Sequence, residues 1–198
     1  MRSVTARSSK GLIIRTAFHV FGKSGIESTS LREVAREAGV SPALVIHHFD
    51  SKQGLVAALD EAVVGEFAEA YAAADAIEGT HDLVRRRGEQ TVRVMGERPD
   101  VCAYVGRAMV EGTAGSYGLF RNMIRGGRAE IDSLAESGVL RPDADRLWAT
   151  LQHFFLIWAP LSFMPMLKEA LGGDLLDPDQ LDRWLDANVE LLAQGLYV

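Results

Sequence analysis

Apolar residues recur every three to four positions along most of the chain, and no run of useful length alternates as a half-buried β-strand would. Capping residues, prolines and glycines divide this helical pattern into about nine segments. The first four helices are predicted at 9–23, at 30–39, at 41–49, and onward from an Asp50-x-x-Gln53 cap. The pattern therefore predicts an all-α protein.

Five further helices are predicted beyond Asp75. They start near Thr80, at Pro99, near Tyr117, at Pro142 and at Asp177-Pro178. Three glycines (Gly112, Gly115 and Gly118) indicate a loop before the third of these helices, and Gly172-Gly173 ends the fourth. We predict an N-terminal domain over 1–56 and a larger helical domain over 57–198.

The most informative segment runs from Ser30 to Lys52. Ser30-x-x-Glu33 is a capping box, and Ser41-Pro42 is an N-cap followed by proline at the first helical position. The two short helices meet at Gly39-Val40, where glycine permits a sharp turn. This arrangement is typical of a helix-turn-helix over about 30–49, whose second helix enters the DNA major groove with its N-terminus first.

The second helix would present an unusual set of side chains to DNA. Pro42 and Ala43 offer small apolar surfaces suited to thymine methyl groups, and either His47 or His48 can face the groove, but not both. Phosphate contacts are expected from basic residues and helix N-termini. The full predicted DNA-binding set is Ser30, Arg32, Ser41, Pro42, Ala43, Leu44, Ile46, His47 and Lys52.

The segment Leu31–Leu55 resembles the signature of the tetracycline-repressor (TetR) family almost residue for residue. The matching features are Ala35, the run Gly39-Val40-Ser41, and the tail His48-Phe49-x-x-Lys52. Ile46 is a departure, because the family usually has a tyrosine there whose hydroxyl contacts phosphate. Either that contact is lost or His47 replaces it. The resemblance implies a homodimeric DNA-binding regulator, most simply a repressor of a palindromic operator, with a ligand-sensing C-terminal body.

Charge and composition agree with this interpretation. The net charge is −6, yet residues 1–60 carry eight basic and five acidic side chains, so the negative charge lies in the remainder of the chain. A basic front on an acidic body suits a protein that presents one end to phosphate. Cys102 is the only cysteine, which excludes an intrachain disulfide, and the N-terminus lacks the apolar stretch of a signal peptide. We expect a cytoplasmic protein.

One segment, Leu147 to Leu167, is almost continuously apolar and long enough to span a bilayer. Gln152 and His153 lie within it and Pro160 and Pro165 interrupt it, so we predict burial against a partner subunit and no membrane contact. The resemblance implies that this helix and the last one pair across a two-fold axis in a four-helix bundle. The predicted dimer residues are Trp184, Leu185, Val189 and Leu192.

The resemblance also implies a small-molecule effector in a pocket among the fifth to eighth helices. Few charges occur there, which favours a largely apolar ligand. Arg87 shares a helical stripe with Thr91 and Met95, so it is either part of a solvated basic face or an anchor for an anionic group. The predicted lining is Arg87, Thr91, Met95, Tyr104, Met109, Tyr117, Phe120, Phe155 and Trp158.

Other functional classes find less support in the residues. Adjacent His47 and His48 point apart on a helix, and no second cluster has the spacing of metal ligands, so we predict neither a metal site nor a cofactor. An enzyme would need a nucleophile elbow, phosphate loop or zinc motif, and none occurs in the sequence. A purely structural dimerisation protein would explain the apolar C-terminal helices but not the segment from Ser30 to Lys52.

Overall fold

The computed structural model describes residues 9–75, 83–112 and 114–196, and within these ranges it contains ten helices and no β-strand. The all-α prediction is therefore confirmed. The helices are α1 (Ser9–Ser24), α2 (Leu31–Glu37), α3 (Pro42–Phe49), α4 (Lys52–Asp75), α5 (Leu83–Glu97), α6 (Pro99–Glu111), α7 (Ala114–Glu136), α8 (Arg146–Ser162), α9 (Met164–Leu171) and α10 (Pro178–Gly195).

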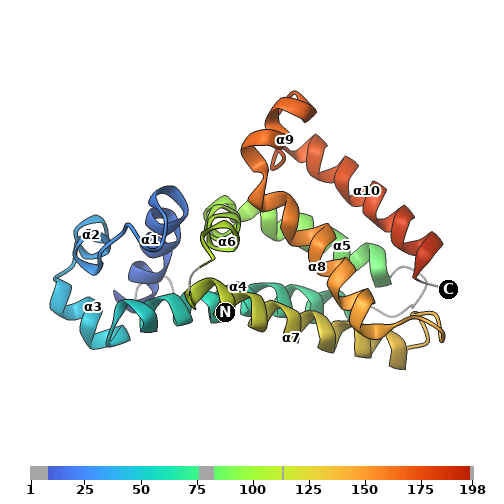
Figure 1. Cartoon of the computed structure of the whole chain (residues 1–198), viewed down its shortest axis with the longest axis horizontal. Helices are drawn as coiled ribbons and strands as arrows, with labels where there is room; N and C mark the ends of the chain where they lie inside the picture. The colour runs from blue at the N-terminus through green and yellow to red at the C-terminus, as the bar shows by residue number, and fades with distance from the viewer. Residues whose placement is uncertain (1–8, 76–82, 113, 197–198) are drawn as a thin grey trace.

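The molecule is elongated, with a small head at one end and a larger body at the other (Figure 1). Helices α1, α2 and α3 form the head. The long α4 leaves the head and runs along α7 into the body, where α5, α8 and α10 pack together (Figure 1). Helix α6 lies between the two parts and packs against α1. Helix α4 is thus a physical connection between the head and the body.

The starts of α2 and α3 follow their capping signals. The Ser30 hydroxyl accepts a hydrogen bond from the Glu33 amide at 3.2 Å, and the Ser41 hydroxyl accepts one from the Leu44 amide at 3.2 Å. Gly39, between the helices, has a φ of +67°, which is accessible to glycine at little cost. The predicted turn between the two helices is confirmed.

The predicted cap of α4 was wrong. Asp50 ends α3 with a φ of +62°, and Ser51 caps α4 by accepting a hydrogen bond from the Gly54 amide at 3.0 Å. A short polar residue such as aspartate tolerates this left-handed conformation better than most. A Cβ on Gly54 would lie 2.0 Å from the Phe49 carbonyl oxygen, so the tight α3–α4 connection requires glycine there.

The glycines at 115 and 118 lie within α7 and do not form the predicted loop. Helix α7 packs against α4, and a Cβ on Gly118 would lie 3.4 Å from an Asp60 carboxylate oxygen, which is an ordinary van der Waals contact. Thr80, the predicted start of the fifth helix, lies outside the described residues, and α5 is described from Leu83.

The apolar segment after Pro142 forms two helices, so the described part of the chain has ten helices where nine were predicted. Helix α8 starts at Arg146, because the Asp145 carboxylate accepts hydrogen bonds from the Leu147 and Trp148 amides. The helical path is interrupted at Phe163, and α9 follows with Pro165 in its first turn. Proline in that position starts a new helix more readily than it continues an old one.

Among the described residues, no single helix combines the length and hydropathy needed to cross a membrane. Helices α8 and α9 together pass that test by length and composition, but they are bent by 85° at the break between them.

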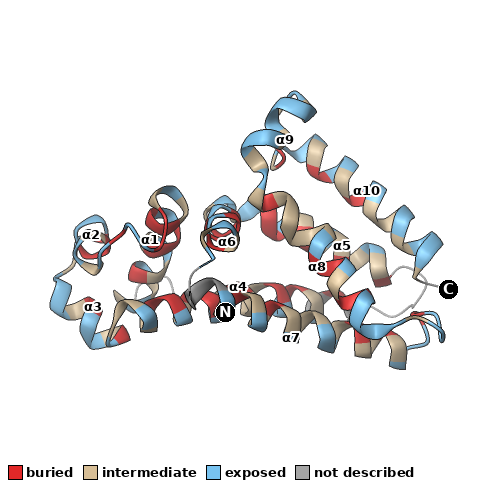
Figure 2. Ribbon diagram, in the orientation of Figure 1, coloured by how far each residue is buried: buried red, intermediate tan, exposed pale blue. Residues whose placement is uncertain are grey.

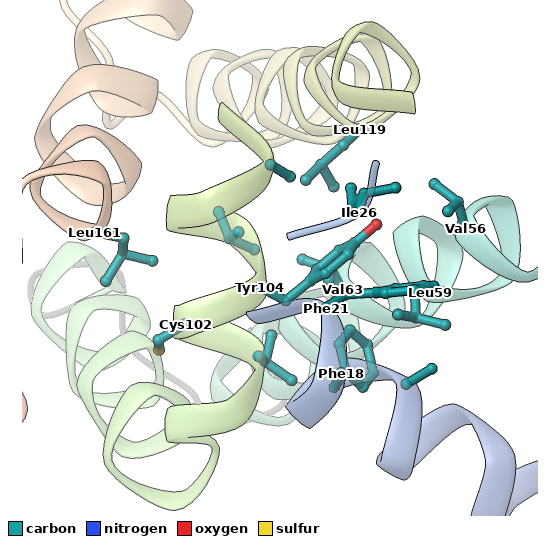
Figure 3. Close-up of a cluster of buried hydrophobic side chains, with 14 of the residues drawn as sticks. Phe18, Phe21, Ile26, Val56, Leu59, Val63, Cys102, Tyr104, Leu119 and Leu161 are labelled. Carbon is teal, nitrogen blue, oxygen red and sulfur yellow. The ribbon is translucent and has the colours of Figure 1, made fainter. Parts of the chain in front are cut away.

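The main core joins α1, α4, α6 and α7 around the fully buried ring of Tyr104 (Figure 3). Phe18 packs edge-on against that ring with 5.3 Å between centroids. A smaller core lies at the far end of α7, around Ile131 and Leu134. Helix α9 has no buried residue, so Figure 2 draws it in the colours of intermediate and exposed residues.

Candidate functional site

The inner side of the helix-turn-helix is buried and closely packed. Val34 and Ala35 of α2 and Val45 of α3 have no exposed surface. Val40, in the turn, packs against the same core. Because α2 and α3 share one core with α1, the position of the second short helix is fixed relative to the rest of the head.

The outer side of α3 is open. Pro42, Ala43, Ile46 and His47 are exposed, with Ile46 at 49% of its full surface, and Leu44 is half-buried. Ser41 is exposed at the N-terminus of α3, and Ser30 and Arg32 are exposed at the start of α2. The structure therefore keeps the predicted DNA-binding residues of α3 on an accessible helix, with the exception of the partly buried Leu44.

The two adjacent histidines have different environments. The His48 Nε2 lies 2.7 Å from the Ser9 hydroxyl, so this ring is held against α1. His47 is exposed. Of the two histidines, His47 is therefore the one that can face a groove. Within the described ranges, no group of three or more His, Cys, Asp or Glu residues is placed to hold a metal ion.

Lys52 is half-buried at the start of α4. Its ammonium group donates a hydrogen bond to the Glu27 carbonyl at 3.0 Å, in the loop between α1 and α2. This contact holds Lys52 beside the helix-turn-helix. Since an ammonium group has three N–H donors, Lys52 can keep this hydrogen bond and still donate to a phosphate.

A cavity of about 340 Å³ lies in the body between α4, α5, α7 and α8. Most of its wall is apolar, and Phe67 packs edge-on against Trp158 at 4.6 Å between ring centroids. The lining residues are Val63, Val64, Phe67, Ala68, Tyr71, Ala72, Arg87, Met123, Gly126, Gly127, Ala129, Glu130, Ser133, Thr150, His153, Phe154, Ile157 and Trp158.

Polar side chains form one part of this wall. The guanidinium of Arg87 lies 3.7 Å from the Glu130 carboxylate, and their side chains are 7% and 15% exposed. The Tyr71 hydroxyl lies 2.9 Å from that of Thr91, which donates to the Arg87 carbonyl. His153 is also buried, and its Nδ1 lies 2.9 Å from the Ala149 carbonyl. Burial, opposed by this hydrogen bond, holds the pKa of His153 below its usual range.

A second, smaller cavity of about 50 Å³ lies beside the first, between α5, α8 and α10. The two cavities share Tyr71, Arg87, Glu130, His153 and Ile157 in their walls. The polar side chains of this shared set therefore lie between α10 and the larger cavity.

The residues predicted for a ligand pocket are only partly brought together. Arg87 and Trp158 line the larger cavity, and Thr91 lines the smaller one. The other predicted lining residues contribute to neither wall. Met95 and Tyr104 are buried in the main core, Met109 is half-buried, and Tyr117 and Phe155 are 62% and 54% exposed. Phe120 packs edge-on against the wall residue Phe154, with 5.0 Å between the ring centroids.

Sequence reasoning missed Tyr71, Glu130 and Thr150 as wall residues. The available signal was polar residues on otherwise apolar helical faces, such as Thr150 and His153 in the apolar run of α8. A buried polar side chain needs a partner, and that need could have marked this face.

The predicted dimer residues face their own subunit in this chain. Leu185 is 6% exposed, and Trp184, Val189 and Leu192 are partly buried. All four line the smaller cavity. Other large apolar side chains of the body are exposed. On α8, α9 and α10 and at the α8–α9 break they are Leu147, Trp148, Phe155, Phe163, Met166 and Leu191, and Val110 on α6 and Tyr117 on α7 are exposed as well.

A buried polar contact joins α4 to α6 near the head. The Tyr104 hydroxyl donates to the Asp60 carboxylate at 2.7 Å, and Asp60 is only 3% exposed. Burial raises the pKa of Asp60 to about 6, the Tyr104 hydrogen bond opposes this shift, and the nearby Glu61 charge adds to it. Burial and the adjacent Asp60 charge also raise the pKa of Tyr104.

Known proteins resemble this chain in sequence. The sequence model described as "Bacterial regulatory proteins, tetR family" matches residues 13–59. The transcriptional regulatory protein RaaS of Mycobacterium tuberculosis is 32% identical over 133 residues, which are 67% of this chain and 60% of the relative. The regulator BetI of Rhizobium meliloti is 37% identical over 62 residues, which are 31% of this chain and 30% of the relative. The chain thus matches less than two thirds of these relatives' length.

Solved structures share the fold over nearly the whole chain. A tetR-family protein from Shewanella superposes with a TM-score of 0.71 at 21% identity, covering 97% of this chain and all of the other. The fatty acid degradation regulator FadR of Bacillus halodurans gives a TM-score of 0.70 at 13% identity, covering 89% and 92%.

These findings define a helical protein with an N-terminal helix-turn-helix and a cavity-bearing helical body. The chain belongs to the TetR family of bacterial regulatory proteins.

Proposed function

We propose that this protein is a transcriptional repressor that binds a palindromic operator as a homodimer and releases it when a small, largely apolar molecule fills the body cavity. The observation that carries the proposal is the pairing of an accessible α3 with a cavity whose wall includes α4, the helix that follows α3 directly.

The DNA-binding part rests on the surface of α3. Its capped N-terminus offers backbone amides to phosphate, while Pro42 and Ala43 offer apolar surface to thymine methyl groups. His47 is exposed beside Ile46 and can supply the polar contact that isoleucine lacks. Arg32 and Lys52 are the candidate phosphate contacts.

The homodimer rests on the exposed apolar surface of the body. Trp148 and Phe155 lie seven residues apart, so they share one face of α8, and Leu191 is exposed on α10. Large exposed apolar side chains close together mark an interface. One short recognition helix also buries too little DNA for specificity, whereas a two-fold dimer reads two half-sites.

The sensing part rests on the cavity. Its volume falls within the range of small-molecule sites, roughly 300–1,000 Å³, and its wall combines apolar rings with a few polar groups. A ligand there contacts α4, and through α4 it can change the spacing of two recognition helices. Release requires only that the ligand bind the DNA-incompetent form more tightly. A regulator of this kind acts in the cytoplasm.

The direct test is a footprint with the full-length protein on DNA upstream of its own gene and the neighbouring genes. We expect protection of a palindromic site, and His47→Ala should change which half-site bases are preferred. His19→Ala removes an exposed histidine of α1 and is the matched control. Protection without two-fold symmetry, or no specific protection at all, would refute the proposed DNA-binding mode.

A further inference from the structure

We propose that the effector is a neutral molecule with an apolar body and a hydroxyl group, and that the cavity disfavours a carboxylate or an ammonium group on the same skeleton. This inference rests on the proposed sensing role of the cavity. It adds the chemical class of the ligand, drawn from the charge balance and the hydrogen-bonding capacity of the wall.

The ionised groups of the wall balance each other. Arg87 and Glu130 lie 3.7 Å apart and are the charged pair of the lining, and both side chains are largely buried. Burial holds the pKa of His153 below its usual value, which favours the neutral ring. The wall therefore has no net charge for an ionic ligand to neutralise.

An ionised ligand would have to disturb this pair. A carboxylate bound to Arg87 would compete with Glu130 and place two negative charges together in a buried site. An ammonium bound to Glu130 would meet the charge of Arg87 in the same way. Separating one partner of a buried ion pair is strongly unfavourable, so we expect either ion to bind at least roughly tenfold more weakly than a neutral analogue.

The hydroxyl groups of Tyr71 and Thr150 already donate their hydrogens to other groups of the protein. Thr91 donates its proton to the Arg87 carbonyl, so the 2.9 Å contact between Thr91 and Tyr71 uses the proton of Tyr71. Thr150 donates to the Arg146 carbonyl at 2.7 Å. The remaining capacity of the Tyr71 and Thr150 oxygens is therefore acceptance.

The polar side of the wall also includes His153. Its Nδ1 donates a hydrogen bond to the Ala149 carbonyl, because a carbonyl only accepts. Tyr71, Thr150 and His153 all line the cavity. A ligand hydroxyl can donate to this side of the wall and accept from Arg87 or Ser133, whereas a ketone can only accept.

The test compares four probes with one ten-carbon skeleton: decan-1-ol, decan-2-one, decanoate and decylammonium. Binding to the full-length protein is followed by the fluorescence of its tryptophans, because Trp158 lies in the wall, and each probe is then tested for release of operator DNA. We expect decan-1-ol to bind at least roughly tenfold more tightly than the two ions and more tightly than the ketone.

Variants separate the wall contact from a general effect on packing. Thr150→Val removes one acceptor and keeps the volume similar, so it should weaken the preference for alcohol over ketone. Tyr71→Phe provides an independent removal of a second acceptor. Ser137→Ala removes an exposed hydroxyl just after the end of α7 and should leave the preference unchanged.

The outcomes distinguish the two proposals. If decanoate or decylammonium binds as tightly as the alcohol and releases DNA, the sensing function holds and the hydroxyl inference is wrong. An unchanged preference in both Thr150→Val and Tyr71→Phe would also overturn it. If none of the four probes binds, the inference fails, and operator footprinting with the unliganded protein still reports separately on DNA binding.

Discussion

Replacing Asp60 with asparagine should stabilise the protein at alkaline pH but not at acidic pH. Asp60 is 3% exposed and accepts a hydrogen bond from Tyr104. Burial raises its pKa from 3.8 in the unfolded chain to about 6 in the folded one. The folded state therefore favours the protonated carboxyl. This stabilisation is fully present below about pH 4 and is lost as the pH rises through about 6.

The magnitude follows from the shift. A difference of about two pKa units corresponds to about 3 kcal/mol, at 1.36 kcal/mol per unit. Asp60→Asn cannot ionise, and its amide oxygen can still accept from Tyr104. The increase in its free energy of unfolding over that of the unsubstituted protein should therefore be about 1–3 kcal/mol larger at pH 8 than at pH 4.5.

The assay is urea unfolding of both proteins at pH 4.5 and pH 8, followed by circular dichroism at one fixed protomer concentration. Glu61→Gln removes an exposed charge from the neighbouring position and should change the pH dependence much less. An equal effect of Asp60→Asn at both pH values would refute the reasoning, because it would mean that Asp60 titrates alike in the folded and unfolded chains.

Three further predictions concern packing, assembly and DNA. Gly106→Ala should lower the free energy of unfolding in urea by more than about 2 kcal/mol, since its Cβ would lie 2.2 Å from the Leu161 carbonyl oxygen. Gly88→Ala meets only a flexible side-chain end, so the same measurement should change by less than about 1 kcal/mol. Trp148→Glu should give a folded monomer by light scattering at micromolar concentration; a persistent dimer would place the interface elsewhere. Lys52→Ala should reduce the salt dependence of operator binding by roughly one unit of slope, and an unchanged slope would exclude Lys52 from phosphate contact.

The head was largely predictable because its signals are local. Ser30 and Ser41 cap helices with their own neighbours, and Gly39 turns the chain through its own backbone freedom. Each of these features depends on a few consecutive residues, which a sequence displays directly. The misplaced cap at Asp50 shows the limit, because both Asp50 and Ser51 suit an N-cap and only the tight turn at Gly54 decides between them.

The cavity was less predictable because it joins side chains from four helices. Met95 and Tyr104 have the same apolar periodicity as true wall residues, but both are buried in the main core. Periodicity identifies the inward face of a helix and does not say whether that face meets another side chain or a space. The contribution of Glu130 depends on its distance from Arg87, which no local pattern reports.

The short connection between α3 and α4 has a mechanical consequence. Only Asp50 and Ser51 separate the two helices, and Gly54 packs against the end of α3, so little slack exists between them. The 24 residues of α4 extend for about 36 Å, at 1.5 Å per residue. Geometrically, a tilt of only about 5° around one end of such a rod moves the other end by about 3 Å. A tilt of that size about the cavity end, too small to disrupt the core, would displace the head and its recognition helix by about 3 Å.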